Sequence, residues 1–428
     1  MLEGEKMRKE KLQMLFNVLG LMGACIYALS ILGIGKLNQS IWIMFVSSLF
    51  IGYRIKDLKV NTQYKMLIIF IILLPIFEHF SAKTFEDKMT LNILRESYKF
   101  FPIFMIPLFT NSIKKIELVC SMVGITVLIN CMTIYKVCKE NNFNFIGTYD
   151  GRFSLSYTSH CMAMLSFLIL GLLLYSIKNN QKKVAIYSMI NYIICIYFVI
   201  LGQRRGAYLA IIIPISVILI LFLDKKKFLI FSLCLGIGIV SITRLPIIKQ
   251  NIYYKRFVSI KDVKEASPAI RLILWDASIK IFKENPIFGV GEDGGAKYYL
   301  EYIENNKEEL NKRLNNSLEG LIEVAKKSNP HNVYFKKIVD LGSLGIYLFF
   351  VLGYIGINQI RIFFKLKNNK NDILYIFIGI IGSYLSFFVM GLTEDVWGTY
   401  VIKNSLFLTL GLYFSFYSIL KKDKILQK

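Results

Sequence analysis

A chain of 428 residues, of which 55% are hydrophobic and 14% aromatic, carries too much apolar surface for a water-soluble protein. Many uninterrupted apolar runs predict an integral membrane protein instead. The formal net charge of +23 does not indicate a nucleic-acid partner, because most of the excess Lys and Arg flank the predicted spans on one side. There they set the topology and attract anionic lipid head groups, so we expect no nucleic acid.

We predict an all-α, polytopic fold with about twelve transmembrane helices, because roughly 20 apolar residues cross the hydrocarbon core. In chain order, the predicted spans are residues 12–35, 40–53, 65–80, 98–112, 116–135, 159–177, 184–201, 206–223, 228–243, 333–360, 373–393 and 397–420. If the N-terminus is cytoplasmic, Lys and Arg are more abundant in the cytoplasmic segments than in the short external loops. Both termini are therefore predicted in the cytoplasm.

Residues 244–332 are the one long stretch outside the predicted spans, between the ninth and tenth helices. Within it, helices are predicted over 268–284 and 298–326, and a turn at Pro286–Gly295 separates them. The second helix has an apolar face, formed by Tyr298, Tyr302, Leu310, Leu314, Leu318, Leu321 and Val324. Because it has apolar faces to bury, this stretch is predicted as a helical extracytoplasmic subdomain. The chain is thus divided into transmembrane helices in 1–243, the subdomain in 244–332 and transmembrane helices in 333–428.

Two adjacent arginines, Arg204 and Arg205, precede Gly206 at the predicted external junction of the seventh and eighth spans. Arginine between long apolar runs is costly unless it reaches the interface or meets an anion. A guanidinium group can grip phosphate with two hydrogen bonds, and glycine lets the backbone approach closely. The alternative is a simple interfacial anchor. Topology alone would favour arginines on the cytoplasmic side, so we favour anion binding.

Arg271 and Trp275 stand four residues apart in the first helix of the predicted subdomain, and therefore on one helical face. Tryptophan prefers the membrane interface, so it would hold Arg271 near the bilayer surface. An ordinary solvated arginine is the alternative.

His331 lies in the sequence Asn329-Pro330-His331-Asn332, where the polar stretch re-enters an apolar one. A neutral imidazole at a water–lipid boundary can accept a proton from an alcohol, since its unperturbed pKa is about 6.5. On a continuous helix, Gly342 and Gly345 would lie about three and four turns beyond His331, on the same face. Such glycines would let another helix pack closely. The alternative is a histidine that only caps a helix.

The other candidates are weaker. His79 is predicted to be incidental, and His160, at the start of the sixth span, is a minor candidate. Glu394 and Asp395 could orient His331 or pair with an arginine, and Arg152 could extend a basic surface for a charged substrate. No Asp-x-Asp sequence or other carboxylate cluster of metal-binding type is evident, so no metal and no cofactor are predicted.

Together these elements resemble the O-antigen ligase/polymerase family of bacterial envelope glycosyltransferases, which has a dozen helices and one large external loop late in the chain. The specific matches are Arg205-Gly206, Arg271-x-x-x-Trp275, the Pro-x-x-Gly-x-Gly turn of Pro286, Gly289 and Gly291, and His331-Asn332 followed after nine residues by Gly342-x-x-Gly345. They cover roughly residues 200–350. Many members have serine or threonine where this chain has Arg204, so we expect Arg205 to be the arginine that acts.

The resemblance implies a GT-C-like fold and an inverting, metal-independent glycosyltransferase in the bacterial cytoplasmic membrane. Such an enzyme takes a glycan from a polyprenyl diphosphate on the outer face and passes it to an acceptor hydroxyl. His331 would be the base, and Arg205 and Arg271 would bind the diphosphate. Further substrate-binding residues would be Arg204, Arg152, Trp275, Asn332 and Glu394. The implied partners are the donor, a glycan or lipid-linked acceptor, membrane lipids, and a chain-length regulator and flippase.

Several functions stay open. We favour a polymerase of O-antigen, capsule or exopolysaccharide repeat units over ligase-type transfer to a lipid, wall polymer or protein. A lipid-linked oligosaccharide flippase is the rival class, but a transporter places its functional charges near the membrane midplane. There the predicted spans offer little beyond Asp340. A sensor that binds glycan without chemistry is a third possibility.

Overall fold

The computed structural model describes residues 2–32, 37–50, 62–81, 97–140, 155–202, 204–224, 226, 266–292, 294–314, 318–423 and 425. These residues form helices and no strand, so the prediction of an all-α polytopic membrane fold is confirmed. The predicted span at 228–243 and the predicted domain boundary at 243/244 lie outside the described residues.

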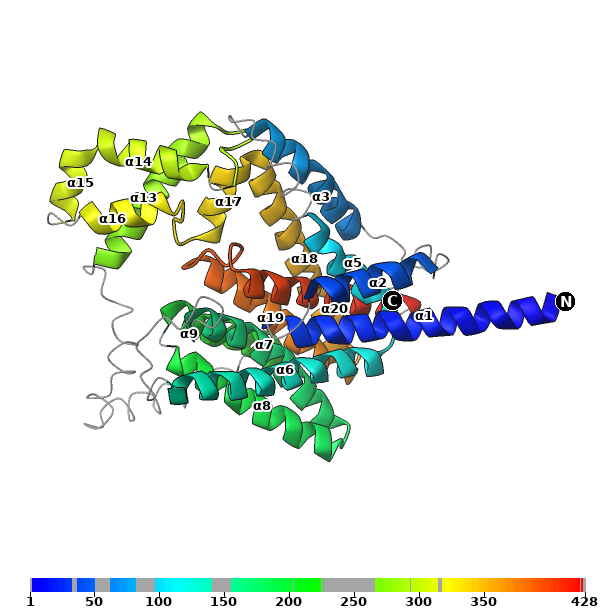
Figure 1. The fold of residues 1–428 in the computed structure, drawn as a ribbon. Helices are drawn as coiled ribbons and strands as arrows, with labels where there is room; N and C mark the ends of the chain where they lie inside the picture. The colour runs from blue at the N-terminus through cyan, green and yellow to red at the C-terminus, as the bar shows by residue number, and fades with distance from the viewer. Residues whose placement is uncertain are drawn as a thin grey trace, which may run out of the picture.

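A helical bundle forms one part of the fold (Figure 1). Its members are α1 (Leu2–Ser30), α2 (Leu37–Phe50), α3 (Thr62–Ser81), α5 (Phe101–Phe109), α6 (Ile113–Glu140), α7 (Leu155–Lys178), α8 (Lys182–Leu201), α9 (Arg205–Phe222), α18 (Ser343–Asn368), α19 (Ile373–Gly391) and α20 (Tyr400–Lys422). Of the described helices, eight are long and apolar enough to cross a membrane: α1, α3, α6, α7, α8, α9, α18 and α19. The apolar α2 and the segment Tyr98–Phe109 are shorter than these eight, and they correspond to the predicted spans 40–53 and 98–112.

The helices α7 and α19 form the centre of the bundle. They are the most buried of the candidate spans in the described part of the chain. The share of buried residues is 72% in α7 and 78% in α19. Small residues let them approach closely, since a Cβ atom on Gly171 would lie 2.8 Å from the Cα atom of Gly379. The two helices run antiparallel, so the start of α7 and the end of α19 lie at the same end of the bundle. The candidate site is built there.

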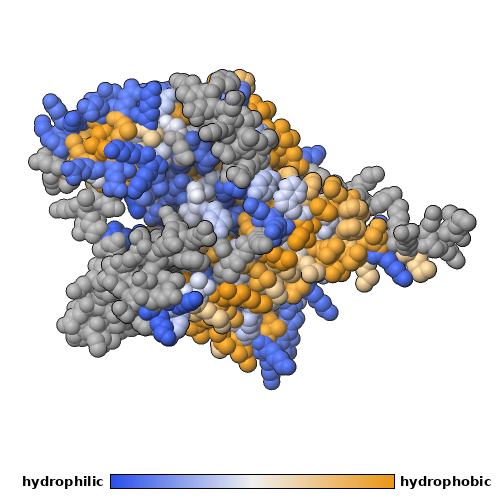
Figure 2. All heavy atoms as spheres, in the orientation of Figure 1, coloured by the Kyte–Doolittle hydropathy of each residue, from blue (hydrophilic) through white to orange (hydrophobic). Residues whose placement is uncertain are grey.

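A second hydrophobic core holds together a smaller group of helices beside the bundle. These are α13 (Ala266–Glu284), α14 (Gly295–Asn305), α15 (Lys307–Arg313) and α16 (Leu318–Lys326), with α17 (Val333–Leu341) packed against α13. The core includes Leu274, Tyr299, Leu321 and Val339, and the Tyr299 hydroxyl lies 2.8 Å from Ser278 Oγ. Figure 2 shows hydrophilic residues gathered over these helices and apolar residues over the bundle. We call α13–α16 the helical subdomain.

The single helix predicted over 298–326 is wrong, because the structure divides this stretch into α14, α15 and α16. The chain folds back at these breaks so that apolar faces of several short helices meet in one core. A continuous helix could turn only one apolar stripe toward α13.

The single helix predicted over 333–360 is also wrong. The chain breaks between α17 and α18 at Gly342, whose φ of 56° suits glycine and strains other residues. Gly342 packs on the backbone of Ile287 and Gly289, and Gly345 packs on the carbonyl group of Lys337. His331 precedes α17, so the two glycines do not continue a helical face from it. What they contact is the backbone of the Pro286–Gly291 turn and of α17, not another long helix.

A buried ion cluster stabilises α17. Asp340 is fully buried and lies 3.1 Å from Lys336 Nζ and 3.4 Å from Lys337 Nζ. A single span over 333–360 would place this aspartate inside the membrane, whereas α17 packs on the helical subdomain. Burial lowers the pKa of Lys337, but Asp340 and Glu292 raise it above its ordinary value, so Lys337 stays an ammonium.

We expect the Asp340→Asn variant to lose about 3–5 kcal/mol of unfolding free energy, since it leaves two buried ammonium groups without their shared carboxylate. Asparagine keeps the volume, so the loss reports charge rather than packing. Denaturant unfolding in detergent measures it. The matched control is Asp276→Asn, at an exposed position of α13, which should change little. Equal stability of the two variants would show that the cluster is not stabilising.

Candidate functional site

Glu394 stands where several separate parts of the chain meet. It follows the end of α19, where the Glu394 backbone N–H donates to the carbonyl oxygen of Met390 at 3.0 Å. One carboxylate oxygen, Oε1, lies 3.5 Å from a terminal guanidinium nitrogen of Arg271. The other, Oε2, lies 3.3 Å from Nδ1 of His331. The carboxylate therefore joins the imidazole to a guanidinium group, and both roles suggested for Glu394 occur together.

The sequence Asn329–Asn332 fixes the position of the imidazole. His331 has a φ of 51°, an uncommon conformation for a residue with a side chain. Its backbone N–H donates to Asn329 Oδ1 at 2.8 Å. Asn332 caps α17 by accepting from the N–H groups of Tyr334 and Phe335 at 2.9 and 3.2 Å, and its Nδ2 donates to the Leu392 carbonyl at 3.2 Å. Strained backbone that the surroundings hold in place is typical of functional sites.

Trp275 attaches α13 to the same segment. Its indole N–H donates to the carbonyl oxygen of Pro330 at 3.0 Å, and its ring stacks on Phe335 at a centroid distance of 5.4 Å. Arg271 lies one helical turn earlier on the same face, as the spacing predicts. The tryptophan therefore holds Arg271 against the histidine segment.

The arginine pair at the start of α9 lies beside this group. Arg204 is the exposed N-cap residue and Arg205 is the first, half-buried residue of α9. A Cβ atom on Gly206 would lie 2.5 Å from Thr393 Oγ1 and 3.2 Å from His160 Nε2, so α9 meets the start of α7 and the residue before Glu394. Both arginines act electrostatically on Arg271. The structure thus brings Arg204, Arg205 and Arg271 into one basic cluster.

Burial and mutual repulsion disfavour the charged form of Arg271 in this cluster. Burial lowers the pKa of Arg271, Glu394 raises it, and the two arginines of α9 lower it further; the result lies below the ordinary value. The Nε–H group of Arg271 is buried and donates to no partner among the described residues. A guanidinium group that is crowded by like charges and half-buried would be stabilised by an anion.

The predicted site residues lie in four different places. His331, Arg205, Arg271, Arg204, Trp275 and Glu394 converge, with Asn332 beneath them as a helix cap. Gly342 and Gly345 lie at the far end of α17, away from the imidazole. Arg152 lies outside the described residues. Asp395 accepts from the Gly398 N–H at 3.1 Å and so shapes the loop after α19.

Sequence reasoning underrated His160. It is 2% exposed, at the start of α7, and it acts electrostatically on Glu394. Its only signal in the sequence was a place at the predicted external end of a span.

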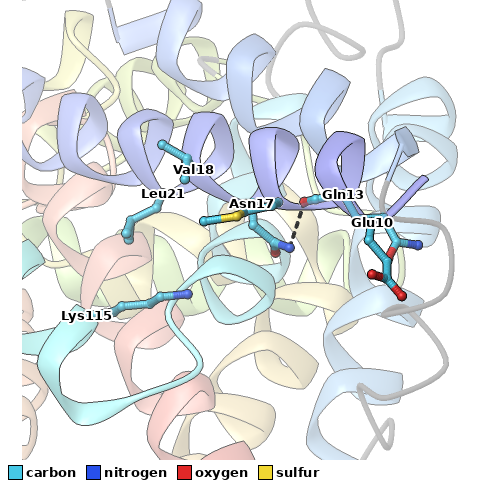
Figure 3. A pocket seen from close by; sticks show the side chains of 7 residues that line it. Glu10, Gln13, Asn17, Val18, Leu21 and Lys115 are labelled. Carbon is cyan, nitrogen blue, oxygen red and sulfur yellow. Dashed lines mark hydrogen bonds between the residues drawn. The ribbon is translucent and has the colours of Figure 1, made fainter. Parts of the chain in front are cut away.

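A groove between α1 and α6 is separate from this cluster. It is lined by Glu10, Gln13, Met14, Asn17, Val18, Leu21 and Lys115 (Figure 3). Lys115 lies in the first turn of α6, whereas the site lies at the start of α7. The two helices run antiparallel. The groove therefore belongs to the opposite end of the bundle.

Within the described residues, no group of three or more His, Cys, Asp or Glu side chains could hold a metal ion.

A family model described as O-antigen ligase matches residues 190–350. Residues 190–350 form a domain of the O-antigen ligase family. This O-antigen ligase domain contains every converging residue except His160 and Glu394, which α7 and the loop after α19 supply. No curated protein matches the chain. The predicted resemblance is therefore confirmed over the segment that carries its motifs.

The O-antigen ligase domain implies a glycosyl-transferring enzyme that uses lipid-linked glycans. With the apolar helices, it makes the protein a bacterial membrane protein.

Acid should weaken the contacts of Glu394. Burial alone would raise the pKa of this carboxyl, but its hydrogen bond with His331 and attraction by His160 and Arg271 bring it below the ordinary value of 4.5. Because the lowered pKa belongs to the folded state, the stabilisation is complete above the pKa of the unfolded carboxyl. It is lost as the pH falls through the folded-state pKa. We therefore expect the melting-temperature gap between wild type and Glu394→Gln to shrink as the pH falls from about 7 to below 4. A gap that stays constant with pH would contradict this.

Proposed function

We propose that the protein transfers a glycan from a polyprenyl-diphosphate carrier to an acceptor hydroxyl on the outer face of the cytoplasmic membrane. The observation that carries this proposal is the bridge made by Glu394 between His331 and Arg271. It joins a proton acceptor to a cationic group within one cluster. Transfer from a lipid diphosphate to an alcohol needs both, on the two sides of the reacting carbon.

His331 is suited to the acceptor side. If Nδ1 carries the proton and donates to Glu394 Oε2, the Nε2 atom is left as the acceptor. In the proposed step, Nε2 takes the hydroxyl proton while the acceptor oxygen attacks the anomeric carbon. Glu394 then stabilises the imidazolium that forms. Attack from the face opposite the carrier inverts the anomeric centre.

The arginines are suited to the leaving-group side. The bond between the anomeric carbon and the phosphate oxygen breaks, and its electron pair leaves with the lipid diphosphate. Arg271 and Arg205, with Arg204 at the exposed edge, would offset this negative charge by hydrogen bonds and electrostatic attraction. Three guanidinium groups can supply the charge stabilisation that a divalent cation supplies elsewhere, so the proposed reaction is metal-independent.

The distribution of basic residues supports an extracytoplasmic site. The site lies at the start of α7 and α9 and at the end of α19, and Lys178 and Asp372 form an ion pair of 3.8 Å at the opposite end. That opposite end carries many lysines: Lys11, Lys114, Lys115, Lys178, Lys182, Lys183, Lys365, Lys367, Lys370, Lys421 and Lys422. Basic residues favour the cytoplasmic side. Both termini would then be cytoplasmic, as the sequence predicts.

We favour a polymerase of polysaccharide repeat units over a ligase that acts on another acceptor. The flippase alternative is less well supported, because the charged residues of the candidate site gather at one end of the bundle and not near its middle. Asp340, the charge expected near the midplane, lies between two lysines of α17 instead.

A purified-protein assay tests the proposal. The protein is reconstituted in vesicles with a polyprenyl-diphosphate-linked oligosaccharide, and glycan products are resolved by mass, with and without a chelator. Elongated glycan and free polyprenyl diphosphate are expected in both conditions. Movement of intact donor across the vesicle membrane without glycan transfer would support the flippase alternative. Activity that is lost with the chelator and restored by a divalent cation would contradict metal independence.

A further inference from the structure

The Pro286–Gly291 turn takes no part in the proposed chemistry, yet the structure holds it firmly against α17. The Val290 and Gly291 N–H groups donate to the carbonyl groups of Val339 and Asp340, both at 2.9 Å. Gly289, with a φ of 70°, packs so closely that a Cβ atom there would lie 2.5 Å from the Asp340 carbonyl oxygen. A turn that is bonded in this way moves as one body with α17.

The outer side of this turn is apolar and exposed. Ile287 is 60% exposed, and no charged residue lies between Pro286 and Gly291. A turn at the surface of a water-soluble subdomain normally carries polar side chains, since its backbone lies in water. The composition of this turn therefore indicates an apolar neighbour.

The end of α3 completes an apolar surface with the turn. The ring of Phe288 lies 5.1 Å from that of Phe77 and 5.3 Å from that of Phe80, between centroids. Phe80 is itself 63% exposed. We call Phe77, Phe80, Ile287 and Phe288 the apolar platform. Its two parts are about 200 positions apart in the chain but lie side by side. α17, to which the turn is bonded, approaches α3 (Figure 1).

The platform lies at the level where two candidate membrane spans end. Phe80 is the last residue but one of the span Thr62–Ser81. The carbonyl oxygen of Ile287 accepts from the backbone N–H and the hydroxyl group of Ser343, at 3.1 and 3.0 Å, and Ser343 begins the span of α18. Both contacts place the turn at the boundary between hydrocarbon and water. Aromatic and aliphatic side chains that face outward there enter lipid.

We infer that the apolar platform inserts into the lipid leaflet and docks the helical subdomain on the bilayer. Its occupant is the hydrocarbon of membrane phospholipids. α17 then extends about 14 Å, at 1.5 Å per residue, from the docked turn to Asn332 and the His331 segment. Because Asn332 Nδ2 also donates to the Leu392 carbonyl just after α19, both ends of α17 are held where membrane spans end, and docking of the turn fixes one of these ends.

Site-specific photocrosslinking of the full chain tests the inference. Benzoylphenylalanine replaces Ile287, and the protein is irradiated in vesicles of phosphatidylethanolamine and phosphatidylglycerol without any glycan donor. We expect phospholipid adducts on the peptide that contains position 287, detected by mass spectrometry. Position 72 serves as a positive reference, because Ile72 lies in the middle of the membrane span α3 and is 59% exposed.

The matched control is position 312. Lys312 is exposed on α15, at the end of the helical subdomain that lies farthest from α17 in Figure 1. Benzoylphenylalanine there should give no phospholipid adduct above background. The inference is overturned if position 287 reacts only with protein or water while position 72 labels lipid, or if positions 287 and 312 label lipid equally. Melting temperatures equal to wild type establish that each variant is folded, and because no donor is used, failure here leaves the proposed glycan transfer standing.

Discussion

The His331→Ala variant should lose glycan transfer by about 100- to 10,000-fold in kcat, the usual contribution of a positioned general base. Alanine removes the only imidazole that both contacts Glu394 and is open to solvent in the described part of the site, with His331 31% exposed and His160 2%. In cells, lipid-linked repeat units that are not elongated should accumulate outside the cytoplasmic membrane. In vitro, single-turnover assays with a polyprenyl-diphosphate donor measure the loss directly.

His79→Ala is the matched control, because His79 is exposed on α3 and lies outside the cluster. It should keep wild-type activity. A His331→Ala variant that retained its polymer would exclude base catalysis by this residue and favour a glycan-binding role. Accumulation of the intermediates on the cytoplasmic side would favour the flippase alternative instead.

Removal of a guanidinium group should have a comparable effect through the leaving group. We expect Arg205→Ala and Arg271→Ala each to reduce kcat by about 100- to 1,000-fold, as loss of one preorganised donor does elsewhere. Arg204→Ala should cost less, because Arg204 is exposed at the edge of the cluster. Lysine keeps the charge but not the two-pronged geometry, so Arg205→Lys should recover only part of the rate.

The control for these variants is Arg313→Ala, since Arg313 is exposed on α15 and pairs only with Glu309 among the described ion pairs. It should leave the rate unchanged. If Arg204→Ala proved more harmful than Arg205→Ala, the assignment of the acting arginine would be reversed. If neither variant changed kcat, the diphosphate would have to bind elsewhere.

The two helix predictions that failed share one physical cause. An apolar pattern continues across Gly342 and across 298–326, so local periodicity predicts one helix in each place. Both stretches are broken in the structure, because the short helices make contacts with residues that are distant in sequence. Gly342 packs on the backbone of Gly289, and α14–α16 share the core around Tyr299. A local hydrophobic pattern cannot predict such tertiary contacts.

The sequence by itself determined that this protein lies in a membrane, that its fold is helical, and which kinds of side chain are available for chemistry. Hydropathy over about 20 residues is a local property, and the O-antigen ligase motifs are local too. Only the tertiary structure decided which of these side chains meet. Glu394 lies 63 residues from His331 and 123 from Arg271, and no spacing rule connects them. Their contact follows from two attachments: Asn332 and Tyr334 bond to the carbonyl groups of Leu392 and Phe388 at the end of α19, and Trp275 of α13 bonds to the carbonyl group of Pro330.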